Sequence, residues 1–280
     1  TWGAASEVET DILTVLQEGV FYGPVSVRHG GVLVTNELQV YYPFSQAGSP
    51  TDDASGNGNT GDVVGATWAN EGWQGGAYSF DGNDYISLGD KFDLAGSVTA
   101  LTVCAWIRPS TTNAERMIVN KLLTSSPYTG WALFLFGNNK VGADLMWSTT
   151  NRALSESVAT VGTDRWYFVA ACFRADPNRL RSEVYVDGVL EGTNQYVGSY
   201  NSLNTTGALW LGYRAPAGQM PYRGLMDDVK IFQRWMPPAE IAMLYQSGST
   251  NAALQVLGPT VLKHLIRQGD VDMGGYTNGP

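Results

Sequence analysis

The stretch from residue 224 to residue 232 places one carboxylate among apolar side chains of an expected strand. Its sequence is Gly-Leu-Met-Asp-Asp-Val-Lys-Ile-Phe. Because side chains alternate between the two faces of a strand, Asp227 should share a face with Leu225, Val229 and Ile231. A buried carboxylate must be paired, hydrogen-bonded, protonated or bound to a metal. Asp227 is therefore a candidate ligand of a buried hard cation, most plausibly calcium. The alternative is a carboxylate that accepts hydrogen bonds from backbone amides at a strand end.

A second group of oxygen-bearing residues lies in the loop from Ser45 to Gly61. Asp52, Asp53, Asn57 and Asn59 supply side-chain oxygens there, and interspersed glycines let the backbone turn tightly. Calcium takes about 6–8 oxygen ligands and accepts backbone carbonyls, so such a loop suits it. A solvated, turn-rich loop explains the same composition.

Few residues could support other metal or nucleophile chemistry. The two histidines, His29 and His264, have no neighbours that form a catalytic set, and no Cys/His spacing predicts zinc. The two cysteines, Cys104 and Cys172, lie in expected strands. The sequence leaves open whether they pair or remain free, buried thiols.

Short apolar runs separated by turns must position these residues, and they predict an all-β fold. Expected strands cover residues 38–44, 77–80, 85–88, 101–107, 116–122, 131–136, 141–147, 166–174, 181–186, 208–213 and 224–232. Their regular spacing, without helical patterns between them, indicates a two-sheet antiparallel sandwich or jelly roll. A short helix with proline at its start follows at residues 237–245.

The two ends of the chain show different patterns. Helical spacing predicts short helices at residues 7–17 and 260–268. A hairpin is expected from residues 25–28 and 32–35, whereas residues 270–280 have the composition of a disordered tail.

Composition narrows the function classes. The chain has 280 residues, 15% of them charged, and a formal net charge of -9, which disfavours nucleic acid. Its longest apolar run, Trp131 to Phe136, is far too short to span a bilayer. The first residue is Thr1 rather than Met, which fits a processed, exported protein and equally fits a trimmed sequence. We therefore expect an extracellular protein, or one at a cell or virion surface.

Eight runs in a fixed order carry a resemblance to a known family. They are Tyr41-Tyr-Pro-Phe44, Asp53-Ala-Ser-Gly-Asn-Gly-Asn-Thr-Gly61, Gly75-Gly-Ala-Tyr-Ser-Phe-Asp-Gly-Asn-Asp-Tyr-Ile86, Leu101-Thr-Val-Cys-Ala-Trp-Ile-Arg-Pro109, Trp166-Tyr-Phe-Val-Ala170, Tyr185-Val-Asp-Gly-Val-Leu190, Gly224-Leu-Met-Asp-Asp-Val-Lys-Ile231 and Pro238-Ala-Glu-Ile241. Through them the chain from about residue 38 to residue 245 resembles the laminin-G-like, concanavalin A-like jelly rolls of lectins and glucanases.

The resemblance implies both an architecture and a metal. It implies two curved antiparallel sheets packed face to face. It also implies a structural calcium near the opening loop and the closing strand, with Asp53, Asn57 and Asp227 as ligands. The predicted organisation is an N-terminal arm over residues 1–37, a jelly roll over 38–247 and a C-terminal arm over 248–280.

The glucanase branch of the family hydrolyses glycosides through the motif Glu-x-Asp-x-x-Glu. Retaining hydrolysis needs two carboxyl groups about 5 Å apart. The nearest match here, Glu183-Val-Tyr-Val-Asp187, lacks the second glutamate, and Asp187 precedes Gly188 in an expected turn. The sequence therefore predicts a protein that is not an enzyme.

Binding is the better hypothesis, because jelly rolls bind sugars by stacking aromatic rings on pyranose faces. The candidate platforms are Trp131, Trp147, Trp210 and Tyr213, and the alternative for each ring is the core. Asn204-Thr-Thr is an N-glycosylation sequon, relevant only in a secreted eukaryotic protein, and otherwise an ordinary loop.

Two classes of function remain at this stage. The first is a non-catalytic, calcium-stabilised module that binds a carbohydrate or glycoconjugate or mediates adhesion. The second is a structural subunit of an extracellular filament, virion or surface assembly, whose terminal arms contact copies of itself.

Overall fold

The computed structural model describes residues 26–28, 37–48, 51–123, 125–126, 128–214, 220–249 and 270–272. The chain divides into two compact units, Asn36–Tyr245 and a second unit that combines Thr1–Thr35 with Gln246–Pro280. The helices predicted at residues 7–17 and 260–268 lie outside the described residues.

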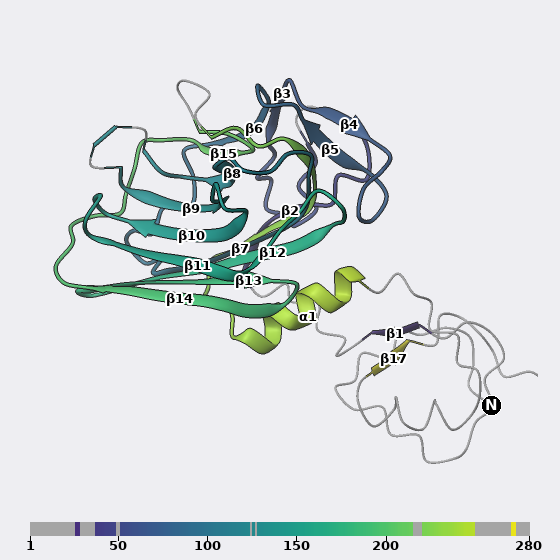
Figure 1. Cartoon of the computed structure of the whole chain (residues 1–280). Helices are drawn as coiled ribbons and strands as arrows, with labels where there is room; N and C mark the ends of the chain where they lie inside the picture. Colours follow the sequence, from purple (N-terminus) through teal and green to yellow (C-terminus); the bar gives the residue numbers. More distant parts are fainter. Residues whose placement is uncertain are drawn as a thin grey trace, which may run out of the picture. The chain divides into compact units, whose positions relative to one another are not determined.

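The larger unit contains two antiparallel sheets, so the predicted all-β sandwich is confirmed (Figure 1). The seven-stranded sheet has the order β11 (Arg152–Thr160), β10 (Lys140–Met146), β9 (Gly130–Leu135), β8 (Arg116–Asn120), β15 (Leu209–Leu211), β6 (Tyr85–Gly89) and β3 (Asp62–Val64).

The second sheet has eight strands, because β2 pairs with β16 beside the main order. That order is β14 (Val189–Val197), β13 (Arg179–Val186), β12 (Tyr167–Asp176), β7 (Ala100–Pro109), β16 (Gly224–Phe232), β5 (Ala77–Phe80) and β4 (Thr67–Ala69), and β2 is Leu38–Tyr42. Four of these fifteen sandwich strands, β3, β4, β11 and β14, were not predicted from the sequence.

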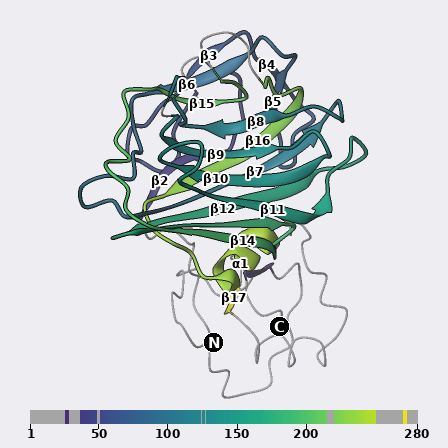
Figure 2. The same ribbon diagram turned by 60° about the vertical axis from the view of Figure 1, so that its left-hand side comes forward.

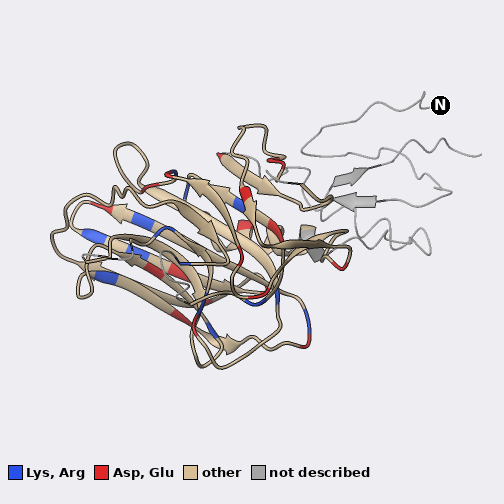
Figure 3. Cartoon of the chain, turned by 90° about the horizontal axis from the view of Figure 1, so that it is seen from above, with Lys and Arg blue, Asp and Glu red and all other residues tan. Residues whose placement is uncertain are grey.

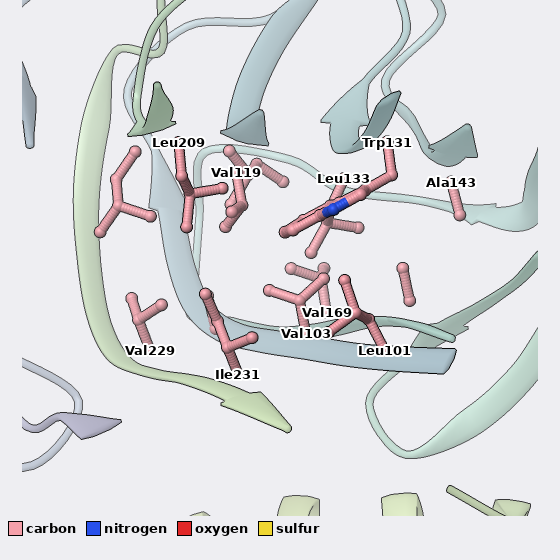
Figure 4. Close-up of a cluster of buried hydrophobic side chains, with 14 of the residues drawn as sticks. Leu101, Val103, Val119, Trp131, Leu133, Ala143, Val169, Leu209, Val229 and Ile231 are labelled. Carbon is pink, nitrogen blue, oxygen red and sulfur yellow. The ribbon is translucent and has the colours of Figure 1, made fainter. Parts of the chain in front are cut away.

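Alternate side chains of facing strands fill the space between the sheets (Figure 4). Leu101 and Val103 of β7 point toward Val119 of β8 and Leu133 of β9. Trp131 is only 1% exposed, and its indole Nε1 donates a hydrogen bond to the Phe92 carbonyl at 2.9 Å. This apolar interior is continuous across the sandwich and supplies most of its stability.

Strand β16 contains a bulge that corrects the predicted position of Asp227. The register with β7 shifts between Asp227 and Lys230, and Asp228 has a φ of 51°. Val229 and Ile231 face the core, whereas Asp227 pairs with Trp106, whose neighbours in β7 face inward. The prediction that Asp227 shares a face with Val229 and Ile231 is therefore wrong, because a bulge inverts the alternation of side chains.

Helix α1 (Pro238–Ser249) covers part of the outer face of the eight-stranded sheet. It lies beside β14 in Figures 1 and 2. The Trp106 ring stacks on Trp73 with centroids 3.9 Å apart, and Tyr245 of α1 packs on it at 5.6 Å. Cys104 and Cys172 lie on this face as free, fully buried thiols. Of the two possibilities that the sequence left open, the structure therefore has free thiols rather than a disulfide. Burial raises the pKa of each thiol to about 12.

The smaller unit contains one described strand pair. Strand β1 (Ser26–Arg28) pairs antiparallel with β17 (Asp270–Asp272). A strand was expected at residues 25–28, whereas residues 270–272, whose composition is typical of a disordered tail, form strand β17. The expected hairpin partner at residues 32–35 lies outside the described residues.

Candidate functional site

Three aromatic rings meet on the outer face of the seven-stranded sheet. Trp210 of β15 lies 4.7 Å from Tyr85 of β6 and 5.6 Å from Tyr213 between ring centroids, and Tyr85 lies 5.4 Å from Tyr213. All three side chains are half-buried, so each ring keeps part of its surface in solvent. We call Tyr85, Trp210 and Tyr213 the aromatic cluster.

A glycine after β15 brings the third ring into the cluster. Residues three positions apart in a regular strand point to opposite faces, so Trp210 and Tyr213 should be separated by the sheet. Gly212, between them, has a φ of 81°, a conformation that favours glycine. A Cβ atom there would lie 2.5 Å from a ring carbon of Phe80, so only glycine fits. The turn at Gly212 therefore returns Tyr213 to the face that carries Trp210.

Polar side chains flank the Trp210 ring along the same face. The register places Trp210 opposite Ser87 of β6 on one side and Asn120 of β8 on the other, and Ser87 opposite Asp62 of β3. Neighbouring strands lie about 4.8 Å apart, so Asp62, Ser87 and Trp210 form a row that spans roughly 10 Å. An exposed carboxylate and a hydroxyl thus lie beside an aromatic surface.

Farther along the same face, an ion pair joins β11 to β10. Arg152 donates to both oxygens of the Asp144 carboxylate, at 3.0 and 2.5 Å. Burial raises the pKa of Asp144 to about 6, while the charge and hydrogen bonds of Arg152 act to lower it. Arg214, two residues beyond Gly212, donates to the Leu123 carbonyl at 3.1 Å, and its guanidinium lies over the Tyr128 ring. In this half of the face, the side chains of Asp144, Arg152 and Arg214 therefore have partners within the chain.

The predicted calcium ligands are engaged by the chain's own donors. Asp53 accepts four hydrogen bonds, from the backbone amides of Tyr41, Ser55 and Asn59 and from the Ser55 hydroxyl. The exposed Asn57 donates through its side chain to the Leu38 carbonyl at 2.7 Å. These bonds tie the loop to β2.

Asp227 accepts hydrogen bonds from other donors than Asp53 does. It is fully buried and accepts hydrogen bonds from the amides of Gln74 at 3.0 Å and Asp228 at 2.7 Å, while burial raises its pKa to about 7. In the described ranges, no three His, Cys, Asp or Glu residues are grouped so that they could hold a metal ion. The residues therefore do not form a ready-made calcium site, and calcium stays a prediction.

The structure separates the four predicted aromatic platforms. Trp210 and Tyr213 lie together in the aromatic cluster, and Trp147 is half-buried against the edge of the core. Trp131 is corrected to a core residue, because a ring that is 1% exposed cannot stack on a sugar. Asn204, the predicted glycosylation site, is exposed in the loop before β15.

Tyr85 is the member of the aromatic cluster that the sequence analysis missed. The alternation in Tyr85-Ile-Ser-Leu88 could have indicated it, because Ile86 and Leu88 face the core and leave Tyr85 outside. What the sequence could not provide is its neighbour in space, since Trp210 follows it by more than a hundred residues.

Several solved structures have the same fold. The binding domain of Paraclostridial Mosquitocidal Protein 1 matches with a TM-score of 0.60 and 14% identity over 76% of this chain and 53% of that one. Domain 4 of AbnA, a GH43 extracellular arabinanase from Geobacillus stearothermophilus solved with arabinotriose, matches with a TM-score of 0.57 and 19% identity over 75% of this chain and 98% of that one.

A third similar structure is the binding domain of Botulinum Neurotoxin DC in complex with SialylT. Its TM-score is 0.56 at 12% identity, over 78% of this chain and 53% of that one. This chain therefore spans about half the length of the two toxin domains. At these identities the likeness shows the fold alone.

Sequence comparison identifies the family. Among curated proteins, none matches the chain. The family model described as the concanavalin A-like lectin/glucanases superfamily matches residues 80–242, which is more than half of the chain and includes the sandwich strands from β6 to β16. The resemblance carried by the sequence motifs is thereby confirmed, and the chain belongs to the concanavalin A-like lectin/glucanase superfamily, in its laminin-G-like branch.

Proposed function

We propose that the protein is a non-catalytic carbohydrate-binding module, and that the aromatic cluster is its binding surface. The observation that carries this proposal is the partly solvent-facing arrangement of Tyr85, Trp210 and Tyr213 beside the polar side chains of Ser87 and Asp62. Aromatic faces pack on the C–H faces of sugar rings, and adjacent polar groups hydrogen-bond to hydroxyls.

The comparisons support the same class of function. The family includes lectins, and one similar structure holds arabinotriose while another holds SialylT. The AbnA domain is part of an extracellular enzyme, which supports an extracellular location here. Among the described residues, no helix is both long and apolar enough to cross a bilayer.

The nearest match to the glucanase motif supports a non-catalytic function. Asp187 accepts a hydrogen bond from the Phe168 amide at 3.0 Å and pairs with Arg165 at 2.8 Å, so its carboxylate stabilises a turn. Glu183 accepts a hydrogen bond from the Tyr185 hydroxyl at 2.5 Å on the outer face of the other sheet. Each carboxylate thus has a structural partner, and the second glutamate that the motif requires is absent.

Binding to immobilised oligosaccharides tests the proposal. Trp210→Ala should lower the affinity for whichever neutral or sialylated oligosaccharide binds best, by about tenfold or more, because a central aromatic contact is lost. Trp68→Ala is the matched control, since this half-exposed indole lies in the other sheet, on β4. An affinity that Trp210→Ala leaves at the wild-type value would refute this site.

Calcium remains part of the proposal as a stabiliser of the loop that contains Asp53 and Asn57. Its support is the concentration of oxygens in that loop and the family resemblance. A rise in Tm of several degrees with calcium chloride, reversed by EDTA and not reproduced by magnesium, is the expected result. A Tm that neither reagent changes would remove calcium from the description.

The assembly alternative is tested by molar mass. Strand β1 of the N-terminal arm pairs with β17 of the C-terminal arm of the same chain. The two arms thus make this contact with each other and not with a second copy. Light scattering after size exclusion should give the mass of a monomer, 30.2 kDa, if the module acts alone. A larger, concentration-dependent mass would favour a subunit of an assembly.

A further inference from the structure

A groove lies on the outer face of the eight-stranded sheet, away from the aromatic cluster. Its floor is a grid of four side chains on β13 and β14, in which Arg181 pairs with Gln195 and Glu183 pairs with Thr193. Trp235, in the segment between β16 and α1, lines the same groove. The groove therefore combines one indole with a guanidinium, a carboxylate, a hydroxyl and an amide.

The backbone on both sides of Trp235 is fixed by one buried hydroxyl. Thr102 of β7 is fully buried, and its Oγ1 donates to the Arg234 carbonyl at 2.7 Å and accepts from the Met236 amide at 3.2 Å. Arg234 also forms an ion pair with Glu240 of α1. Because the chain is held immediately before and after Trp235, the indole is positioned without any ligand, which lowers the entropic cost of binding.

The two charged side chains of the floor differ in their partners. Arg181 lies 3.7 Å from the Asp176 carboxylate, beyond hydrogen-bond distance, and its buried Nε has no hydrogen-bond partner in the described chain. Glu183 is directed by the Tyr185 hydroxyl, its hydrogen-bond donor at 2.5 Å. The four-residue floor carries one positive and one negative charge, so it is neutral and offers both donors and acceptors.

We propose that this groove is a second carbohydrate-binding site, which takes a neutral, hydroxyl-rich sugar against the face of Trp235. The four polar side chains suit vicinal hydroxyls, which donate and accept at once, better than they suit an anion or an apolar ligand. The chain's net charge of -9 also disfavours an acidic polysaccharide. The choice of a sugar rests on the proposed function, but the site does not share residues with the aromatic cluster.

Affinity electrophoresis of the full chain in gels containing arabinan, xylan or galactan tests the groove. We expect Trp235→Ala and Trp210→Ala each to reduce the retardation of the wild-type chain, by about tenfold in apparent affinity. The double variant should migrate as in a gel without polysaccharide. Thr193→Lys, which fills the groove from an exposed position, should act like Trp235→Ala, whereas Thr67→Lys on edge strand β4 is its matched control.

The possible outcomes separate the two sites. If Trp235→Ala and Thr193→Lys leave retardation unchanged while Trp210→Ala abolishes it, the groove is refuted and the aromatic cluster stands. If only the groove variants abolish retardation, the groove stands and the aromatic cluster is refuted as a site. A wild-type chain that no polysaccharide retards contradicts both. Thermal unfolding of each variant shows whether a loss of binding comes from a loss of the fold.

Discussion

A tryptophan is buried on one outer face of the sandwich and partly exposed on the other. On the eight-stranded sheet, Trp106 is buried beneath Trp73 and Tyr245, and it is 1% exposed. On the seven-stranded sheet, Trp210 contacts two tyrosines and remains half-exposed. Both rings alternate with core residues along their strands, so the strand pattern alone does not distinguish them.

The difference lies in what the chain places above each ring. Helix α1 and the segment around Trp73 cover Trp106, and Asp227 holds that segment by accepting a hydrogen bond from the Gln74 backbone amide. The ring contacts of Trp210 are with Tyr85 and Tyr213 on its own face, and the ring stays half-exposed. Lys and Arg are interspersed with Asp and Glu along the ribbon of the sandwich in Figure 3. An aromatic ring on an outer face is therefore structural where the chain covers it and available for binding where it does not.

The largest expected effect is on the covered face. Trp106→Ala should lower the free energy of unfolding by about 3–5 kcal/mol, because it leaves a cavity under Tyr245 and Trp73. Trp210→Ala should cost about 1 kcal/mol, since it removes only partly buried ring contacts. Urea unfolding of the two variants beside the wild type measures both values. Equal losses of stability would contradict the distinction between a covered and an open face.

The ion pair on the open face predicts a smaller, pH-dependent effect. The pKa of Asp144 is about 6 in the folded chain and about 3.9 in an unfolded one, so folding favours its protonated form. Its contribution to stability is therefore fully present below about pH 4 and is lost as the pH rises through 6. The wild-type free energy of unfolding, minus that of Asp144→Asn, should fall by about 2 kcal/mol between pH 4 and 7.

A matched variant controls for the general effect of pH on the fold. The pKa of the exposed Asp164 is lowered by the hydrogen bond from the Tyr167 hydroxyl, so the difference between wild type and Asp164→Asn should not fall with pH. A difference for Asp144→Asn that is constant or rises with pH would show that Arg152 outweighs burial at this carboxylate.

Most of the fold could be predicted from the sequence, because the central strands carry continuous or alternating apolar residues. Strands β11 and β14 were missed for a physical reason. They form the edges of their sheets. Strand β11 alternates buried with exposed polar residues, as in Ser155, Glu156 and Ser157, whereas β14 contains no buried residue, so the apolar signal of both strands is weak. Short strands such as β3 are held by pairing across the sheet, which a local pattern does not contain.

The candidate site was predictable only in part. Trp210 and Tyr213 were named from their residue types, but regular alternation would have placed them on opposite faces. The positive φ of Gly212 resolves this, just as the bulge at Asp228 overturns the predicted orientation of Asp227. Such irregular positions depend on the contacts of the folded chain, as with the ring of Phe80 against Gly212. Tyr85 and Trp235 were missed because their importance arises from neighbours distant in sequence.

The smallest expected change is in the accessibility of thiols to a reagent. Measuring it compares the two faces in the native chain. Cys104 and Cys172 are fully buried on the covered face and their pKa values are raised to about 12, so the native chain should not react with an aromatic disulfide reagent at pH 8. In Ser87→Cys, the new thiol lies beside Trp210 on the open face and should react in the native state. Absorbance should report one reactive thiol in that variant, none in the native wild type and two in the denatured wild type. A native wild-type chain that reacts would show that the face under Tyr245 opens to solvent, and the contrast between the faces would then be one of degree.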